Sequence, residues 1–149
     1  MADRRRIVLL RVLLGGLAVA SATIGAWAQA LPRSFYDDFP GFGRVWVALD
    51  GPYNEHLVRD VGGLNLALAL LLAAAAVTVG PVLVRVAAGS ALLYGAPHLV
   101  YHLAHLDLYD TADQVGNAVA LGLGVVAPLA VLLLARPSAP ILDGKRRWC

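Results

Sequence analysis

Four long apolar blocks limit what this chain of 149 residues can fold into. They cover about residues 7–28, 61–79, 82–103 and 115–135. Each is close to the ~20 residues that a helix needs to cross ~30 Å of hydrocarbon, whereas a spanning strand has ~10 residues of alternating polarity. Runs such as Leu-Leu-Ala-Ala-Ala-Ala do not alternate. The predicted fold is therefore all-α, a four-helix transmembrane bundle.

The composition supports a membrane protein over a soluble domain. Hydrophobic residues make up 59% of the chain and charged residues 15%, against roughly 45–50% and about 25% in soluble domains. We predict one integral membrane domain over residues 1–149, with helices over about 7–28, 53–79, 82–104 and 115–135 and a tail over 136–149. Asp50 and Pro52 suit the start of the second helix. Gly80 and Pro81 indicate a tight turn before the third.

The segment between the first two helices is long and rich in aromatic residues, which are Phe35, Tyr36, Phe39, Phe42, Trp46 and Tyr53. Aromatic side chains are enriched at the membrane–water interface. We therefore expect a structured extracytoplasmic cap that lies on the outer face of the bundle.

The placement of basic residues predicts the orientation. Nine of the twelve lie at the N-terminus, in the turn between the second and third helices, or in the C-terminal tail. By the positive-inside rule, the chain is a multi-pass protein of the cell membrane with both termini in the cytoplasm. One alternative stays open. The N-terminus is similar to a secretory signal, because it has a basic start, an apolar run and the motif AWAQA (residues 26–30). Cleavage of such a signal would leave three helices in the same orientation.

Several classes of function are disfavoured. The net charge of +2 follows from this topology and favours contact with anionic membrane lipid over binding of nucleic acid. The pairs Gly15-Gly16 and Gly62-Gly63 lack the spacing and the lysine of a phosphate loop, and small residues in lipid usually mark helix-packing seams. Cys149 is the only cysteine, which excludes an internal disulfide and a thiolate metal cluster.

Three of the four histidines, His98, His102 and His105, fall within eight residues near the outer end of the third helix. Spacings of four and seven residues place their side chains along one stripe. Ionisable groups within a membrane are costly and usually face the bundle interior, a cavity or a partner. The stripe therefore indicates either a metal or proton site or a hydrogen-bonded structural cluster. Tyr94 and Tyr101 would supply hydroxyls to the same region.

Polar groups of the other helices are expected at the same level. They are His56, Glu55, Asp60 and Asn65 of the second helix, and Asp113 and Asn117 of the fourth. Glu55 pairs with Arg59 at helical spacing, which favours a surface ion pair. The spacing of His56 and Asp60 leaves two interpretations open, because the carboxylate either orients a metal-ligating imidazole or raises its pKa.

The plan of the chain resembles the small four-helix membrane proteins of the DoxX-like group, an uncharacterised family common in actinobacteria. The resemblance rests on the Gly-Gly pair in RDVGGLNLALALLL, on the preceding extracytoplasmic loop and on the tight Gly-Pro turn. It implies a four-helix membrane bundle, and it implies no activity.

Two function hypotheses follow. The first is an accessory membrane protein that docks a membrane lipid, a larger membrane-protein partner or a second copy of itself, with its polar pocket at the outer face. The second is a metal- or haem-binding protein or enzyme. His98, His102, His105 and His56 are its candidate ligands, and Glu55, Asp60 and Asp113 are second candidates. This donor set suits Zn, Fe, Cu or a haem.

Overall fold

The protein, described by a computed structural model over residues 2–135, has four long helices. They are α1 (Ala2–Ala30), α3 (Glu55–Thr78), α4 (Pro81–Ala104) and α5 (Thr111–Leu134). Between α1 and α3 lie α2 (Pro32–Asp38), the antiparallel strands β1 (Pro40–Gly41) and β2 (Arg44–Val45), and the 3-10 helix η1 (Val47–Leu49). A second 3-10 helix, η2 (Leu106–Leu108), joins α4 to α5. The all-α prediction is confirmed, while the predicted tail lies outside the described residues.

The helix ends differ from the predicted ones by a few residues, for local reasons. α3 begins two residues after its predicted start at residue 53, because Asn54 caps this helix by accepting a hydrogen bond from the Leu57 amide. The predicted role of Asp50 at the start of this helix was wrong, since Asp50 is the residue that ends η1. The start of α5 is earlier than predicted because the Asp110 side chain accepts from the Asp113 amide. The tight turn is confirmed, with α3 ending in the left-handed residue Val79 and α4 beginning at Pro81.

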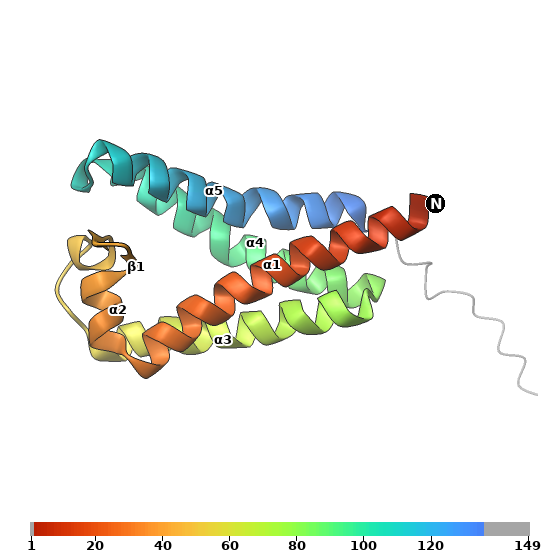
Figure 1. Ribbon diagram of the computed structural model, residues 1–149, viewed down its shortest axis with the longest axis horizontal. Helices are drawn as coiled ribbons and strands as arrows, with labels where there is room; N and C mark the ends of the chain where they lie inside the picture. Colours follow the sequence, from red (N-terminus) through yellow and green to blue (C-terminus); the bar gives the residue numbers. More distant parts are fainter. Residues whose placement is uncertain (1, 136–149) are drawn as a thin grey trace, which may run out of the picture.

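The long helices form two pairs. α1 packs mainly on α3 and α4 packs mainly on α5, with fewer contacts between the pairs. α1 and α4 cross between α3 and α5, and the short elements that follow α1 lie at the end of the bundle opposite the N-terminus (Figure 1). We call residues 32–50 the cap, and this end the cap end. The main apolar core, which includes Leu14, Leu72, Val84 and Val131, joins all four helices.

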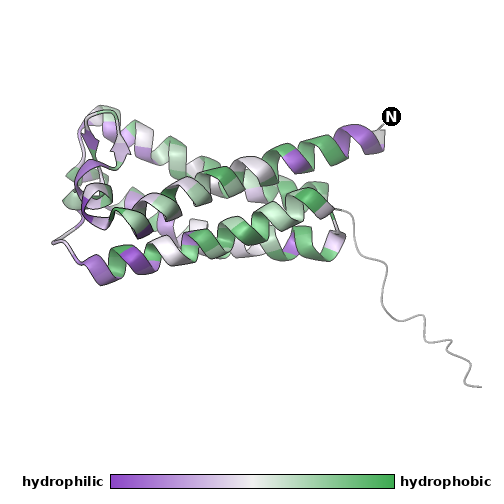
Figure 2. Cartoon of the chain, turned by 60° about the horizontal axis from the view of Figure 1, so that its bottom comes forward, coloured by the Kyte–Doolittle hydropathy of each residue, from purple (hydrophilic) through white to green (hydrophobic). Residues whose placement is uncertain are grey.

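All four long helices are long and apolar enough to cross a membrane. Many of their large apolar side chains are exposed, among them Val19 on α1, Leu70 on α3, Leu93 on α4 and Leu133 on α5. Hydrophobic residues dominate the helices along their length, and hydrophilic residues gather at the cap and near the N-terminus (Figure 2). An apolar surface this extensive is unusual for a soluble monomer, so the pattern fits a multi-pass membrane protein.

Glycines set the closest approach of the helices, as expected for packing in lipid. A Cβ at Gly62 of α3 would lie 2.7 Å from the Gln29 amide nitrogen of α1, and one at Gly25 of α1 would lie 2.9 Å from the Gly62 carbonyl oxygen. The expectation of a glycine seam therefore holds for Gly62. It does not hold for Gly15 or Gly63, where a Cβ would meet nothing within 4 Å.

Candidate functional site

The cap is anchored to α1 by an aromatic cluster. Phe35 packs edge-on against Trp27 of α1 at 5.9 Å between ring centroids, and Phe39 lies 6.0 Å from both Trp27 and Trp46. The buried residues of this cluster are Phe35, Ala28 of α1 and Val58 of α3. The predicted structured cap is thus present, and it is fixed to the first pair of helices.

Two polar side chains fasten the cap to the second pair of helices. The indole nitrogen of Trp46 donates to Asp113 Oδ1 at 2.9 Å. The Arg44 guanidinium lies 3.2 Å from Asp110 Oδ2 and 3.3 Å from Asp113 Oδ1. The hydrogen bond from the backbone amide of Asp113, and then the charge of Arg44, hold the pKa of Asp110 below its usual value. The Asp113 carboxylate, a predicted second candidate ligand, is thus engaged by the cap.

A carboxylate, a phenol and an imidazole meet where the cap touches α4. The Tyr109 hydroxyl donates to Asp50 Oδ1 at 3.2 Å and lies 3.3 Å from His102 Nδ1. The opposite ring nitrogen of His102 lies 3.9 Å from Asp50 Oδ2. Burial, and then the charge of Asp50, raises the pKa of Tyr109. The sequence interpretation missed Asp50 and Tyr109 as site residues, because neither has a spacing that links it to the histidines.

The histidine stripe enters the bundle at its first two members. His102 is 8% exposed, and its ring lies edge-on against that of His98 at 4.6 Å between centroids. His98 is half-buried and stacks on Tyr94 at 5.5 Å. A continuous row of rings therefore runs from Tyr94 through His98 and His102 toward Tyr109.

The third member of the stripe points elsewhere. α4 ends at Ala104, and His105 follows with φ −123° and ψ 26°. Its ring stacks on Tyr101 at 4.3 Å, and its Nδ1 lies 2.7 Å from the Tyr101 carbonyl oxygen. Tyr101 is exposed and touches His102 with its ring edge at 5.5 Å. Half-buried His105 and exposed Tyr101 thus form a separate pair beside the buried rings.

The predicted contribution of His56 is not found at the buried rings. Its Nε2 lies 3.3 Å from Asp60 Oδ2, and the His56 side chain is 88% exposed. Glu55 forms the expected surface ion pair with Arg59 at 2.8 Å. Neither pair has a contact with the α4 histidines within the described residues, so these groups lie outside the site.

A cavity of about 440 Å³ lies between the two pairs of helices, next to His98. All four long helices line it, and its lining is mostly small or aliphatic residues, with Ser21, Asn65, Tyr94 and His98 as polar members. Val12 of α1 and Leu123 of α5 line it and are exposed, so the cavity is open toward the surface between these two helices. No lysine, arginine, aspartate or glutamate is among its lining residues.

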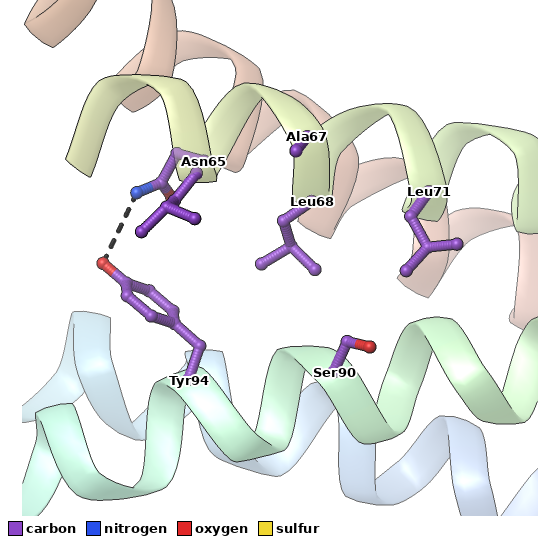
Figure 3. Close-up of a pocket in the computed structure, with 7 residues that line it drawn as sticks. Asn65, Ala67, Leu68, Leu71, Ser90 and Tyr94 are labelled. Carbon is purple, nitrogen blue, oxygen red and sulfur yellow. Dashed lines mark hydrogen bonds between the residues drawn. The ribbon is translucent and has the colours of Figure 1, made fainter. Parts of the chain in front are cut away.

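A smaller hollow of about 290 Å³ adjoins the cavity between α3 and α4. Asn65 and Tyr94 separate the two, with the Asn65 side-chain nitrogen donating to the Val61 carbonyl oxygen at 2.9 Å and lying 3.4 Å from the Tyr94 hydroxyl. Figure 3 shows the hydrogen bond between Asn65 and Tyr94, with Leu68, Leu71 and Ser90 further along the hollow. The predicted pocket residues Asn65 and Tyr94 are thus brought together.

Two side chains near the cap end of the cavity have unused hydrogen-bonding capacity within the described part of the chain: Asn117, which is not among the cavity-lining residues, and His98, which is. Asn117, 1% exposed, is the only residue there with a buried and unpaired side-chain atom, its Oδ1. The Asn117 side chain does make a hydrogen bond with the Tyr109 hydroxyl, which lowers the pKa of Tyr109 against the larger effect of burial. The His98 ring makes ring contacts and no hydrogen bond.

Within residues 2–135, no group of three or more His, Cys, Asp or Glu side chains is arranged to hold a metal ion. His98 and His102 are adjacent, but His105 and His56 are engaged elsewhere. Comparisons of the chain with protein-family models, with curated proteins and with solved structures give no match. What the site can do is therefore inferred from its geometry alone.

Proposed function

We propose that this chain is a multi-pass membrane protein that holds the apolar chain of a membrane lipid between its two pairs of helices, in an accessory role without chemistry of its own. The observation that carries the proposal is the cavity of about 440 Å³, lined by all four long helices. Ligand pockets are typically about 300–1,000 Å³ and mostly apolar, with a few placed polar groups. Membership of a DoxX-like group stays a prediction from the sequence.

The position of the opening supports a ligand that arrives from the bilayer. The cavity is open between α1 and α5, beside exposed Val12 and Leu123. Both helices are long and apolar enough to span the membrane, so this opening would face lipid tails. A lipid would enter sideways with its apolar chain first, and its head would remain toward the cap end.

A substitution that fills the cavity tests this. Ala20 and Ala26 are both exposed alanines of α1, but Ala20 lines the cavity and Ala26 lines none of the described cavities. We expect the purified wild-type protein and Ala26→Phe to retain lipid after delipidation in detergent, and Ala20→Phe to lose it. The retained lipid is quantified by mass spectrometry of the extract. Equal retention by Ala20→Phe and the wild type would refute the proposal.

A transition-metal or haem site is the second candidate, favoured by the direct contact of His98 with His102. Two imidazoles would need further metal ligands, and the Asp50 carboxylate, whose Oδ2 lies 3.9 Å from His102 Nε2, would be the next one. Elemental analysis and an absorption spectrum of the purified protein test this candidate. A metal content that is the same in the wild type and in the double variant His98→Ala/His102→Ala would eliminate it.

A further inference from the structure

The polar side chains near the cap end of the cavity restrict the chemistry of the lipid head group that can bind there. From the unpaired Asn117 oxygen and the free His98 ring, we infer that the cavity takes a neutral lipid alcohol, whose uncharged hydroxyl binds between these two side chains. This inference rests on the proposed lipid-binding function and specifies the class of lipid.

The first argument is charge. A phosphate head group needs cationic partners, usually arginine or lysine, and neither residue lines the cavity. Asp50 lies beside His102, and Asp113 in the first turn of α5 is buried. Arg44 is engaged by Asp110 and Asp113. An anionic or zwitterionic phospholipid head would thus meet carboxylates without a free cation.

The second argument is the balance of donors and acceptors. A buried acceptor without a donor is unfavourable, and Asn117 Oδ1 is such an acceptor. A hydroxyl carries one donor and two acceptor lone pairs. It would donate to Asn117 Oδ1 and accept from the His98 ring, whose neutral form has one N–H. One small uncharged hydroxyl would thus supply both the donor that Asn117 lacks and the acceptor that His98 lacks.

The third argument is position. Asn117 precedes the cavity-lining residues Ala120 and Leu121 by three and four residues, so it lies on the same face of α5, one turn toward the cap. His98 lies one turn beyond Tyr94 on α4, again toward the cap. Contacts through Tyr109 and His102 connect the two groups. A lipid with its apolar chain in the cavity would therefore place its head at their level.

A competition between two lipids with the same acyl chains tests the inference. The purified protein is equilibrated with mixed micelles that contain equal amounts of 1,2-dioleoylglycerol and dioleoylphosphatidic acid, and the retained lipids are measured by mass spectrometry. We expect dioleoylglycerol to be enriched over its proportion in the micelle. One hydrogen bond changes affinity by about three- to tenfold, so Asn117→Leu and His98→Phe should each reduce the enrichment by about that factor.

The variants separate the outcomes. Asn117→Leu keeps the size of the side chain, and His98→Phe keeps a ring between Tyr94 and His102, so at least one variant should fold. Equal retention of the two lipids by the wild type, with both lost in Ala20→Phe, would overturn the inference and leave the proposed function standing. Enrichment that neither Asn117→Leu nor His98→Phe reduces would also overturn it. If neither lipid is retained, the proposed function itself fails.

Discussion

Adding one methyl group at Gly62 should separate α1 from α3 and destabilise the protein. A Cβ there would lie 2.7 Å from the Gln29 nitrogen and 3.1 Å from the Ala28 carbonyl carbon. These distances are well inside the ~3.5–4.0 Å optimum for nonbonded heavy atoms. Both neighbours are backbone atoms, so no side chain can rotate away, and the two helices themselves have to move.

The neighbouring glycine provides a matched control. A Cβ at Gly63 would meet nothing within 4 Å, yet Gly62 and Gly63 both lie inside α3. Replacing either by alanine gains helix propensity, worth up to ~1 kcal/mol in each case, so this contribution cancels between the variants. The remaining difference is the cost of overpacking, typically about 1–3 kcal/mol.

Thermal unfolding of the purified protein, followed by circular dichroism in detergent, measures this difference. For a chain of this size, 1 kcal/mol shifts the midpoint by about 2–4 °C, so Gly62→Ala should unfold about 2–12 °C below Gly63→Ala. Coincident midpoints of the two variants would show that the backbones of α1 and α3 are not in contact at Gly62, and the reasoning would be refuted.

Three further predictions concern the cap. Trp46→Phe removes the donor to the buried Asp113 carboxylate, so the free energy of unfolding in denaturant should fall by about 1.5–3 kcal/mol; an unchanged value would mean that the cap is not held there. Because the pKa of Tyr109 is raised in the folded protein, this phenol ionises at a lower pH in the unfolded chain than in the folded one. Its contribution to the free energy of unfolding is therefore complete below the ordinary pKa of 10.0 and is lost as the pH rises above it. Tyr109→Phe should weaken this loss in unfolding midpoints measured on both sides of about pH 10, and an unaltered pH dependence would contradict it. A Gly43→Cys variant in a cysteine-free background should react with an impermeant thiol reagent added outside intact cells, and labelling from the cytoplasmic side alone would reverse the predicted orientation.

The sequence predicted the helices well because each one leaves a local signal. An apolar block of spanning length needs no knowledge of its neighbours, and Gly80 and Pro81 mark their own turn. The pairs Glu55–Arg59 and His56–Asp60 also depend on helical spacing alone, and both are present.

The candidate site was predicted only in part, because its contacts join distant segments. Asp50 was interpreted as the start of a helix, since nothing in its neighbourhood shows that it meets Tyr109. The end of α4 at Ala104 agrees with the predicted boundary, but the histidine stripe was extended one residue beyond it to His105, whose ring packs on Tyr101. An unpaired atom such as Asn117 Oδ1 becomes visible only when every neighbour has been placed.

The division of the bundle into two pairs has a consequence for its biosynthesis. The two helices of each pair follow one another along the chain, separated only by short elements. α1 and α3 can therefore associate as soon as Thr78 has been inserted, before α4 is synthesised. α4 and α5 then add as a second hairpin. In that order of assembly the cavity would form last, where the two hairpins meet. Any lipid between them at that moment would be enclosed during assembly.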